Sequence, residues 1–87
     1  MTKVLDFYAD WCGPCKVMKP VFEELEEEYK GKVEFESIDV EQQGSLASKY
    51  QVMSIPTFVI LEDEEEVDRR LGAMPKEAFK SWLEEHV

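Results

Sequence analysis

Two cysteines, separated by a glycine and a proline, stand between a stretch that favours a β-strand and a stretch that favours a helix. The motif Trp-Cys-Gly-Pro-Cys at residues 11–15 follows the apolar residues 3–9 and precedes a run in which apolar side chains recur every three or four positions. A strand that leads directly into a helix puts the junction at the carboxyl end of a sheet. The motif therefore predicts an α/β arrangement with both thiols at the carboxyl end of the sheet.

The rest of the chain continues the alternation of strands and helices. Alternating or continuous apolar runs predict strands, and apolar stripes spaced by three and four predict helices. The predicted strands cover residues 3–9, 33–40, 57–61 and 66–71, and the predicted helices cover residues 15–29, 45–50 and a C-terminal segment with Phe79, Trp82 and Leu83. We expect the order βαβαββα, a four-stranded mixed sheet with helices on both faces, in a single domain of residues 1–87.

The connection between the last two strands is unusual. Four consecutive acidic residues occupy positions 62–65, and none of them is the glycine that a tight hairpin usually contains. The geometry of this turn is therefore left open by the sequence.

An excess of acidic residues limits the possible partners. The chain carries twenty Asp and Glu against ten Lys and Arg, a formal net charge of −10. Such a surface repels the phosphates of nucleic acids and anionic lipids, and no window is long and apolar enough to span a bilayer. We expect no nucleic-acid partner and no membrane partner. Because the N-terminus lacks an apolar signal segment, we expect a cytoplasmic location.

The two cysteines are predicted to be reactive rather than structural, because a disulfide between them closes a loop too short to constrain the unfolded chain much. Cys12, at the start of the predicted helix, is the expected nucleophile, since the helix dipole favours a thiolate there. Cys15, one turn further on, would attack Cys12 and release the reduced substrate. Asp6, placed inside by strand alternation, is the candidate base for the buried thiol. The other interpretation of Asp6 is an acid at a strand end that reaches solvent.

Three segments resemble the thioredoxin family. Residues 5–16, Leu-Asp-Phe-Tyr-Ala-Asp-Trp-Cys-Gly-Pro-Cys-Lys, are similar to its active-site stretch, residues 54–57, Ser-Ile-Pro-Thr, to its cis-proline loop, and residues 71–73, Leu-Gly-Ala, to the glycine after its last strand. The resemblance covers nearly the whole chain. The family's leading strand and helix are expected to be missing, which leaves a minimal core shared with glutaredoxins and puts residues 33–40 at an exposed edge of the sheet.

The resemblance implies a thiol–disulfide oxidoreductase that reduces protein disulfides through a Cys12–Cys15 dithiol/disulfide cycle. Gly13 and Pro14 would tune the redox couple, and the bond before Pro56 would be cis. The implied docking surface around the thiols consists of Trp11, Met53, Ile55, Pro56, Gly72 and Ala73. The alternative for the tryptophan is that it caps the core. We also expect a thioredoxin reductase as external electron donor, because nothing in the chain could bind a flavin or a nicotinamide, and no bound cofactor beyond the redox-active disulfide. A monomer without a metal is expected, with a dimer as the alternative because the sheet edge is less protected.

One position beside Asp6 departs from the family pattern. Many thioredoxins have a lysine on the neighbouring strand that faces the buried acid, whereas the matching residue here is Ser37. Without that positive charge, the pKa of Asp6 is expected to be raised, so that the acid stays protonated at neutral pH. Two consequences are open: resolution by Cys15 slows, or a water bridged through the Ser37 hydroxyl carries the proton.

Three other functions are compatible with a pair of cysteines at this spacing. A glutathione-dependent, glutaredoxin-like reductase fits the short fold, but the intervening Gly-Pro and the negative charge, which repels the carboxylates of glutathione, argue against it. A non-catalytic adaptor would keep its partner after both cysteines were replaced by serine. A structural zinc site is disfavoured because it needs four ligands, and His86 is the only other soft ligand.

Overall fold

The computed structural model describes all residues from 1 to 87, and its elements follow the predicted order. The strands and helices are β1 (Thr2–Tyr8), α1 (Gly13–Glu28), β2 (Val33–Asp39), α2 (Gly44–Lys49), β3 (Thr57–Glu62), β4 (Glu65–Leu71) and α3 (Lys76–Glu84). The largest difference from the expected boundaries is at the start of α1, which begins at Gly13 instead of residue 15. None of the three helices combines the length and apolar character that crossing a membrane requires.

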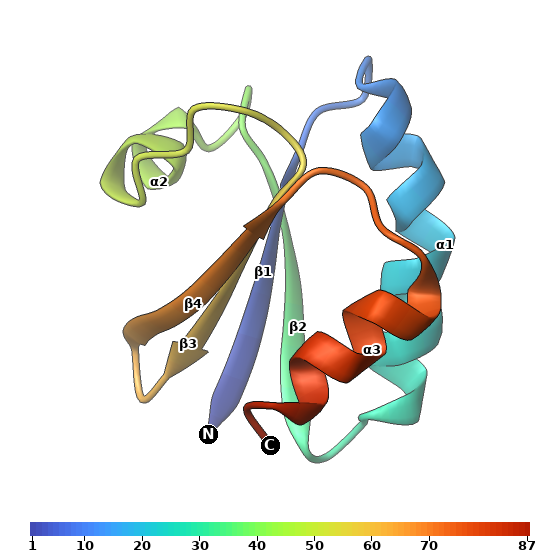
Figure 1. Cartoon of the computed structure of the whole chain (residues 1–87). Helices are drawn as coiled ribbons and strands as arrows, with labels where there is room; N and C mark the ends of the chain where they lie inside the picture. The colour runs from blue at the N-terminus through green and yellow to red at the C-terminus, as the bar shows by residue number, and fades with distance from the viewer.

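The four strands form one mixed sheet in the order β2-β1-β3-β4. β1 runs parallel to β2 and antiparallel to β3, and β3 pairs antiparallel with β4. Helices α1 and α3 cover one face, and α2 lies over the other (Figure 1). β2 is an edge strand, as predicted. The register aligns Asp6 with Ser37 of β2 and with Phe58 of β3, so these three side chains share the face beneath α1.

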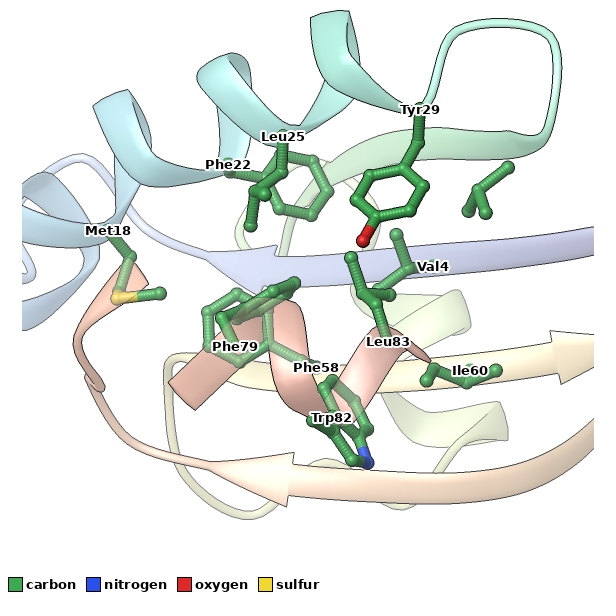
Figure 2. Packing of buried hydrophobic residues seen from close by; sticks show 11 residues of the cluster. Val4, Met18, Phe22, Leu25, Tyr29, Phe58, Ile60, Phe79, Trp82 and Leu83 are labelled. Carbon is green, nitrogen blue, oxygen red and sulfur yellow. The ribbon is translucent and has the colours of Figure 1, made fainter. Parts of the chain in front are cut away.

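The larger core lies between the sheet and the two helices α1 and α3, and it is rich in aromatic rings (Figure 2). Phe58 of β3 and Phe79 of α3 are fully buried and meet edge to face, with ring centroids 4.8 Å apart. Phe22 of α1 lies 6.3 Å from each of them. A smaller cluster beneath α2 contains Leu5, Phe7, Ile38, Val59 and Leu61. Because β1 contributes to both cores, the end of β1 that carries the cysteine motif is held from both sides.

The acidic connection between β3 and β4 is a tight two-residue turn. Its two central residues, Asp63 and Glu64, have φ angles of 50° and 74°. Hairpins of this length favour positive φ at both positions, because that geometry matches the twist of the strands. The turn therefore adopts the usual hairpin geometry without the usual glycine, and Glu64 bears the steric cost of the left-handed region.

Replacing Glu64 with glycine is expected to raise the free energy of unfolding by about 1 kcal/mol, because glycine adopts positive φ without a Cβ clash. Asp63 is left in place, since its carboxylate lies 3.0 Å from the N-terminal amine. Urea unfolding at pH 7 measures the change. Glu65→Gly is the matched control: it removes the same side chain from β4, where glycine weakens a strand. A Glu64→Gly variant that loses stability as the control does would contradict the prediction.

Candidate active site at the start of helix α1

The cysteine motif lies where the polypeptide leaves β1 and enters α1. Cys12 is the N-cap residue of the helix, with an extended backbone at φ −83° and ψ 113°. Its N–H donates a hydrogen bond to the carbonyl oxygen of Ala9 at 3.2 Å. Pro14 stands in the first helical turn, where the missing N–H of proline costs no helical hydrogen bond. The two cysteines are therefore at the carboxyl end of the sheet, as the sequence predicts.

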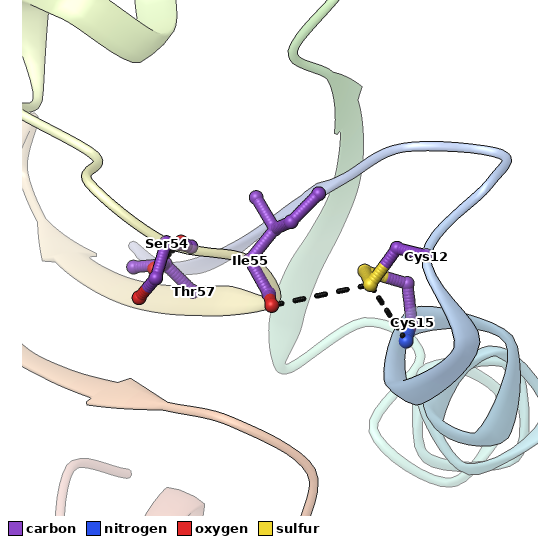
Figure 3. The surroundings of a disulfide bond; sticks show 5 residues. All are labelled: Cys12, Cys15, Ser54, Ile55 and Thr57. Atoms are coloured by element: carbon purple, nitrogen blue, oxygen red, sulfur yellow. Dashed lines mark hydrogen bonds between the residues drawn. A yellow bond between two sulfur atoms is a disulfide. The ribbon is translucent and has the colours of Figure 1, made fainter.

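Cys12 and Cys15 form a disulfide across one helical turn, with their Cα atoms 5.2 Å apart. The backbone N–H of Cys15 donates to Sγ of Cys12 at 3.2 Å (Figure 3). This donor and the amino end of the helix both favour negative charge on the Cys12 sulfur once the bond is reduced. Each cysteine is only 5% exposed, so accessibility does not distinguish the two sulfurs. Position at the helix terminus distinguishes them.

The loop before β3 lies against the disulfide. The peptide bond between Ile55 and Pro56 is cis, as the resemblance implied. The carbonyl oxygen of Ile55 lies 3.9 Å from Sγ of Cys12 (Figure 3). Pro56 itself is buried, and its carbonyl oxygen accepts a hydrogen bond from the N–H of Gly72 at 2.9 Å. The loop before β3 therefore places Ile55 beside Cys12, and Gly72 is hydrogen-bonded to that same loop.

Large apolar side chains near these loops are exposed. Trp11 is 66% exposed and donates its indole N–H to Glu41 at 2.8 Å, which excludes the interpretation that Trp11 caps the core. Met53, two residues before Ile55, is 93% exposed. Leu71, which precedes Gly72, is also exposed, and the sequence pattern does not single it out. The signal available for Leu71 is its apolar side chain at the end of a predicted strand. The alternation of apolar and polar residues along a strand does not show which face of the sheet is covered by helices.

Asp6 lies inside the sheet beneath the cysteines. The residue is 5% exposed, which excludes the interpretation that it reaches solvent at a strand end. Burial raises the pKa of Asp6 from 3.8 to about 7, in the direction expected for an acid without a neighbouring positive charge. Its Oδ1 atom accepts no hydrogen bond. A pocket of about 310 Å³ is lined by Asp6, Cys15 and Ser37 among others, so the structure brings the candidate base and the second thiol to one space.

One group of side chains outside this site has the composition of a metal site. Asp68, Glu85 and His86 offer ligand atoms that lie within 4.8 Å of one another. The carboxylate of Asp68 already accepts a hydrogen bond from the indole of Trp82 at 2.8 Å and lies 3.0 Å from Nε2 of His86. The bond from Trp82 is the main reason that the pKa of Asp68 is lowered to about 2. These contacts explain the group as an anchor for the end of α3.

Comparison with known proteins gives one consistent family. The Thioredoxin family model matches residues 1–85. The thioredoxin of Staphylococcus epidermidis is 47% identical over 85 residues, which cover 98% of this chain and 82% of that protein. The thioredoxin of Staphylococcus aureus is 45% identical with the same coverage. The structure of a mutant thioredoxin from Halobacterium salinarum NRC-1 superposes with a TM-score of 0.89 at 39% identity, covering 98% of this chain and 74% of that one.

Proposed function

The chain belongs to the thioredoxin family and is a thiol–disulfide oxidoreductase, and we propose that it reduces disulfides in protein substrates with Cys12 as the attacking thiol. In this proposal Cys15 is the resolving thiol and Asp6 accepts its proton. The observation that carries the assignment is the hydrogen bond from the N–H of Cys15 to Sγ of Cys12 at the amino end of α1. That environment stabilises a thiolate on Cys12.

The proposed cycle transfers two electrons to the substrate. The Cys12 thiolate attacks one sulfur of the substrate disulfide, that S–S bond breaks, and the second substrate sulfur leaves as a thiolate that takes up a proton. Cys15 then gives its proton to Asp6 and attacks Sγ of Cys12. The mixed disulfide breaks, the Cys12–Cys15 disulfide forms, and the first substrate sulfur leaves as a thiolate. The protein is oxidised and the substrate is reduced.

We propose that the substrate docks as an extended segment beside the disulfide. The backbone of Ile55 next to Cys12 and the exposed side chains of Trp11 and Met53 support this docking mode. Gly72, with its N–H bonded to the Pro56 carbonyl, and the exposed Ala73 continue the proposed surface from the loop that follows β4. Apolar side chains in such a patch favour contact with a partner protein.

A further turnover requires an electron donor that reduces the Cys12–Cys15 disulfide again. We extend to this chain the donor known for its family, a thioredoxin reductase, and propose a cytoplasmic location and no bound cofactor. Glu34 and Glu36 on the edge strand β2 support a monomer, because charged side chains discourage strand pairing at an edge.

The reduction potential of the cysteine pair tests the proposed direction of electron flow. Thioredoxin has a reduction potential of about −270 mV and glutaredoxins have potentials of about −200 to −230 mV, and we expect this pair to lie near the thioredoxin value. Equilibration with dithiothreitol or glutathione buffers, alkylation and mass spectrometry measure it. Cys15→Ser is the control, since it removes the intramolecular couple. A potential of about −230 mV or higher would favour the glutathione-dependent alternative, and the absence of any reversible couple would favour an adaptor.

A further inference from the structure

The two edge strands of the sheet, β2 and β4, differ in how they are protected against pairing with another chain (Figure 1). The pairing of β4 with β3 contains a register shift between Ile60 and Leu61, and such an irregularity at an edge discourages the addition of a further strand. Strand β2 is in continuous register with β1 along its whole length and contains no proline. Of the two edges, β2 is thus the regular one, to which an extended segment can add.

The outward-facing backbone groups of β2 have no partner in the protein. Consecutive residues of a strand direct their N–H and C=O groups to opposite sides, and the N–H of Val40, just after β2, donates to the carbonyl oxygen of Tyr8 on β1 at 2.9 Å. The odd-numbered residues of β2 therefore face away from β1. Val33 agrees, because its N–H donates to the C-cap residue of α1 at 3.0 Å. The N–H and C=O groups of Phe35 and Ser37, which take part in no turn, loop or cap hydrogen bond, are left for solvent or for a partner.

The side chains that flank this edge differ between the two faces of the sheet. Phe35 is in register with Val4, on the face beneath α1, and its half-buried ring meets Phe22 edge to face with centroids 5.0 Å apart. Glu34 and Glu36 lie on the opposite face, because successive side chains of a strand alternate. A segment added to this edge therefore meets an aromatic ring on one face and two carboxylates on the other.

The face that carries Glu34 and Glu36 is acidic. Lys3 of β1 forms an ion pair with Glu36 at 2.8 Å, and this contact raises the pKa of Lys3, with further contributions from Glu34 and from Glu64 in the turn after β3. One lysine thus stands near three carboxylates, and Glu34 forms no ion pair of its own. The unpaired negative charge favours a positively charged side chain at this position.

A hollow of about 340 Å³ lies along the amino-terminal half of the same edge. It is lined by residues 33–36 of β2, by Lys3, and by Glu26, Lys30 and Gly31 from the end of α1 and the turn that follows. Carboxylates outnumber amines among these residues, so the hollow adds to the preference for positive charge. It also provides space for the side chains of an added segment.

We propose that the β2 edge binds a partner protein by accepting an extended segment in which Lys or Arg side chains alternate with apolar ones. The backbone of that segment pairs with the free N–H and C=O groups of Phe35 and Ser37. Its apolar side chains contact the ring of Phe35, and its basic side chains face Glu34 and Glu36. A second copy of this chain is disfavoured there, because it would bring its own glutamates to the same edge. No cysteine takes part, so this interaction is independent of the proposed redox cycle.

NMR spectra of the ¹⁵N-labelled full chain test the proposal with a synthetic peptide. The peptide has blocked ends, and Lys alternates with Val along it. We expect it to shift the amide signals of Phe35 and Ser37 in a saturable way and to slow the exchange of these two amides with solvent, because strand pairing protects them. The same peptide with every backbone amide N-methylated is the control, since it cannot donate hydrogen bonds. Equal binding of the N-methylated peptide would contradict strand addition.

Reversing one charge at the edge tests the preference for a basic segment. Glu34→Lys places a positive charge beside the lysines of the peptide and is expected to weaken binding about threefold to tenfold. Glu65→Lys is the matched control, because it changes the net charge by the same amount at an exposed position on β4. It should leave the affinity within about twofold of the parent chain. Equal weakening by both variants would mean that the net charge of −10 alone attracts the peptide, and would overturn the proposal.

A second copy of this chain is the other possible occupant of the edge. Sedimentation of the free protein, combined with amide exchange at several concentrations, detects it. If Phe35 and Ser37 become protected as the concentration rises and a dimer forms, a second copy fills the edge and the proposed partner is overturned. The absence of any shift at these two amides with about 1 mM peptide would also overturn it. The rate of disulfide reduction, measured on the same samples, shows whether the proposed function holds independently.

Discussion

Replacing Cys15 with serine is expected to stop turnover and to leave the substrate attached to Cys12 as a mixed disulfide. The attacking thiol is intact in this variant, but the thiol that would release the substrate is gone. Replacing Cys12 with serine is expected to stop turnover without a covalent complex, because Cys15 lies within the first turn of α1 and not at the N-cap position that favours a thiolate. Each variant should reduce the rate of disulfide reduction to the uncatalysed background. Intact-protein mass spectrometry, before and after dithiothreitol, detects the adduct.

The two single variants can be compared directly because both cysteines are equally buried. Each is 5% exposed, so a difference in trapping cannot arise from simple access in the oxidised fold. The double variant, with both cysteines replaced by serine, is the control and should form no adduct. Trapping by Cys12→Ser but not by Cys15→Ser would reverse the assigned roles. Retention of a partner by the double variant, without any covalent step in the single variants, would point to the adaptor instead.

The active-site junction could be predicted because its determinants are local. The strand pattern, the two cysteines and the helix pattern are contiguous, so their order alone puts Cys12 at a helix start and at the end of a strand. The pocket beside Asp6 could not be predicted in the same way. It depends on the register between Asp6 and Ser37, which are thirty-one positions apart, and on the packing of α1 above them.

The geometry of the turn between β3 and β4 and the exposure of Trp11 could not be predicted from the sequence, for different reasons. The turn at Asp63 and Glu64 requires positive φ at both residues, which Glu64 disfavours, so residue propensity alone does not predict the turn, and the pairing of β3 with β4 fixes it. Trp11 is exposed, and its indole donates a hydrogen bond to Glu41 in the loop after β2. An aromatic residue next to a core strand is compatible with burial or exposure, and only the tertiary arrangement distinguishes them.

Replacing Asp6 with asparagine is expected to stabilise the oxidised protein by an amount that grows with pH. The folded-state pKa of about 7 lies above the ordinary value of 3.8, so the unfolded chain loses this proton first. The stabilisation from the neutral acid is fully present below 3.8, falls by about 1.4 kcal/mol per pH unit, and is lost above about 7. Asparagine stays neutral throughout. The two proteins should therefore have similar free energies of unfolding near pH 3.8 and differ by about 4 kcal/mol above pH 8.

Urea unfolding of both proteins between pH 4.5 and pH 8.5 measures this difference, and groups other than Asp6 cancel because both chains contain them. Asp10→Asn removes the same charge from an exposed position and is the matched control. A difference that does not change with pH would contradict the raised pKa that burial gives Asp6. Asp6→Asn is therefore expected to raise the free energy of unfolding and, at the same time, to slow the attack of Cys15 on Cys12. An acid with only a structural role would not produce both, because its neutral replacement would stabilise the fold and leave the Cys15 reaction unchanged.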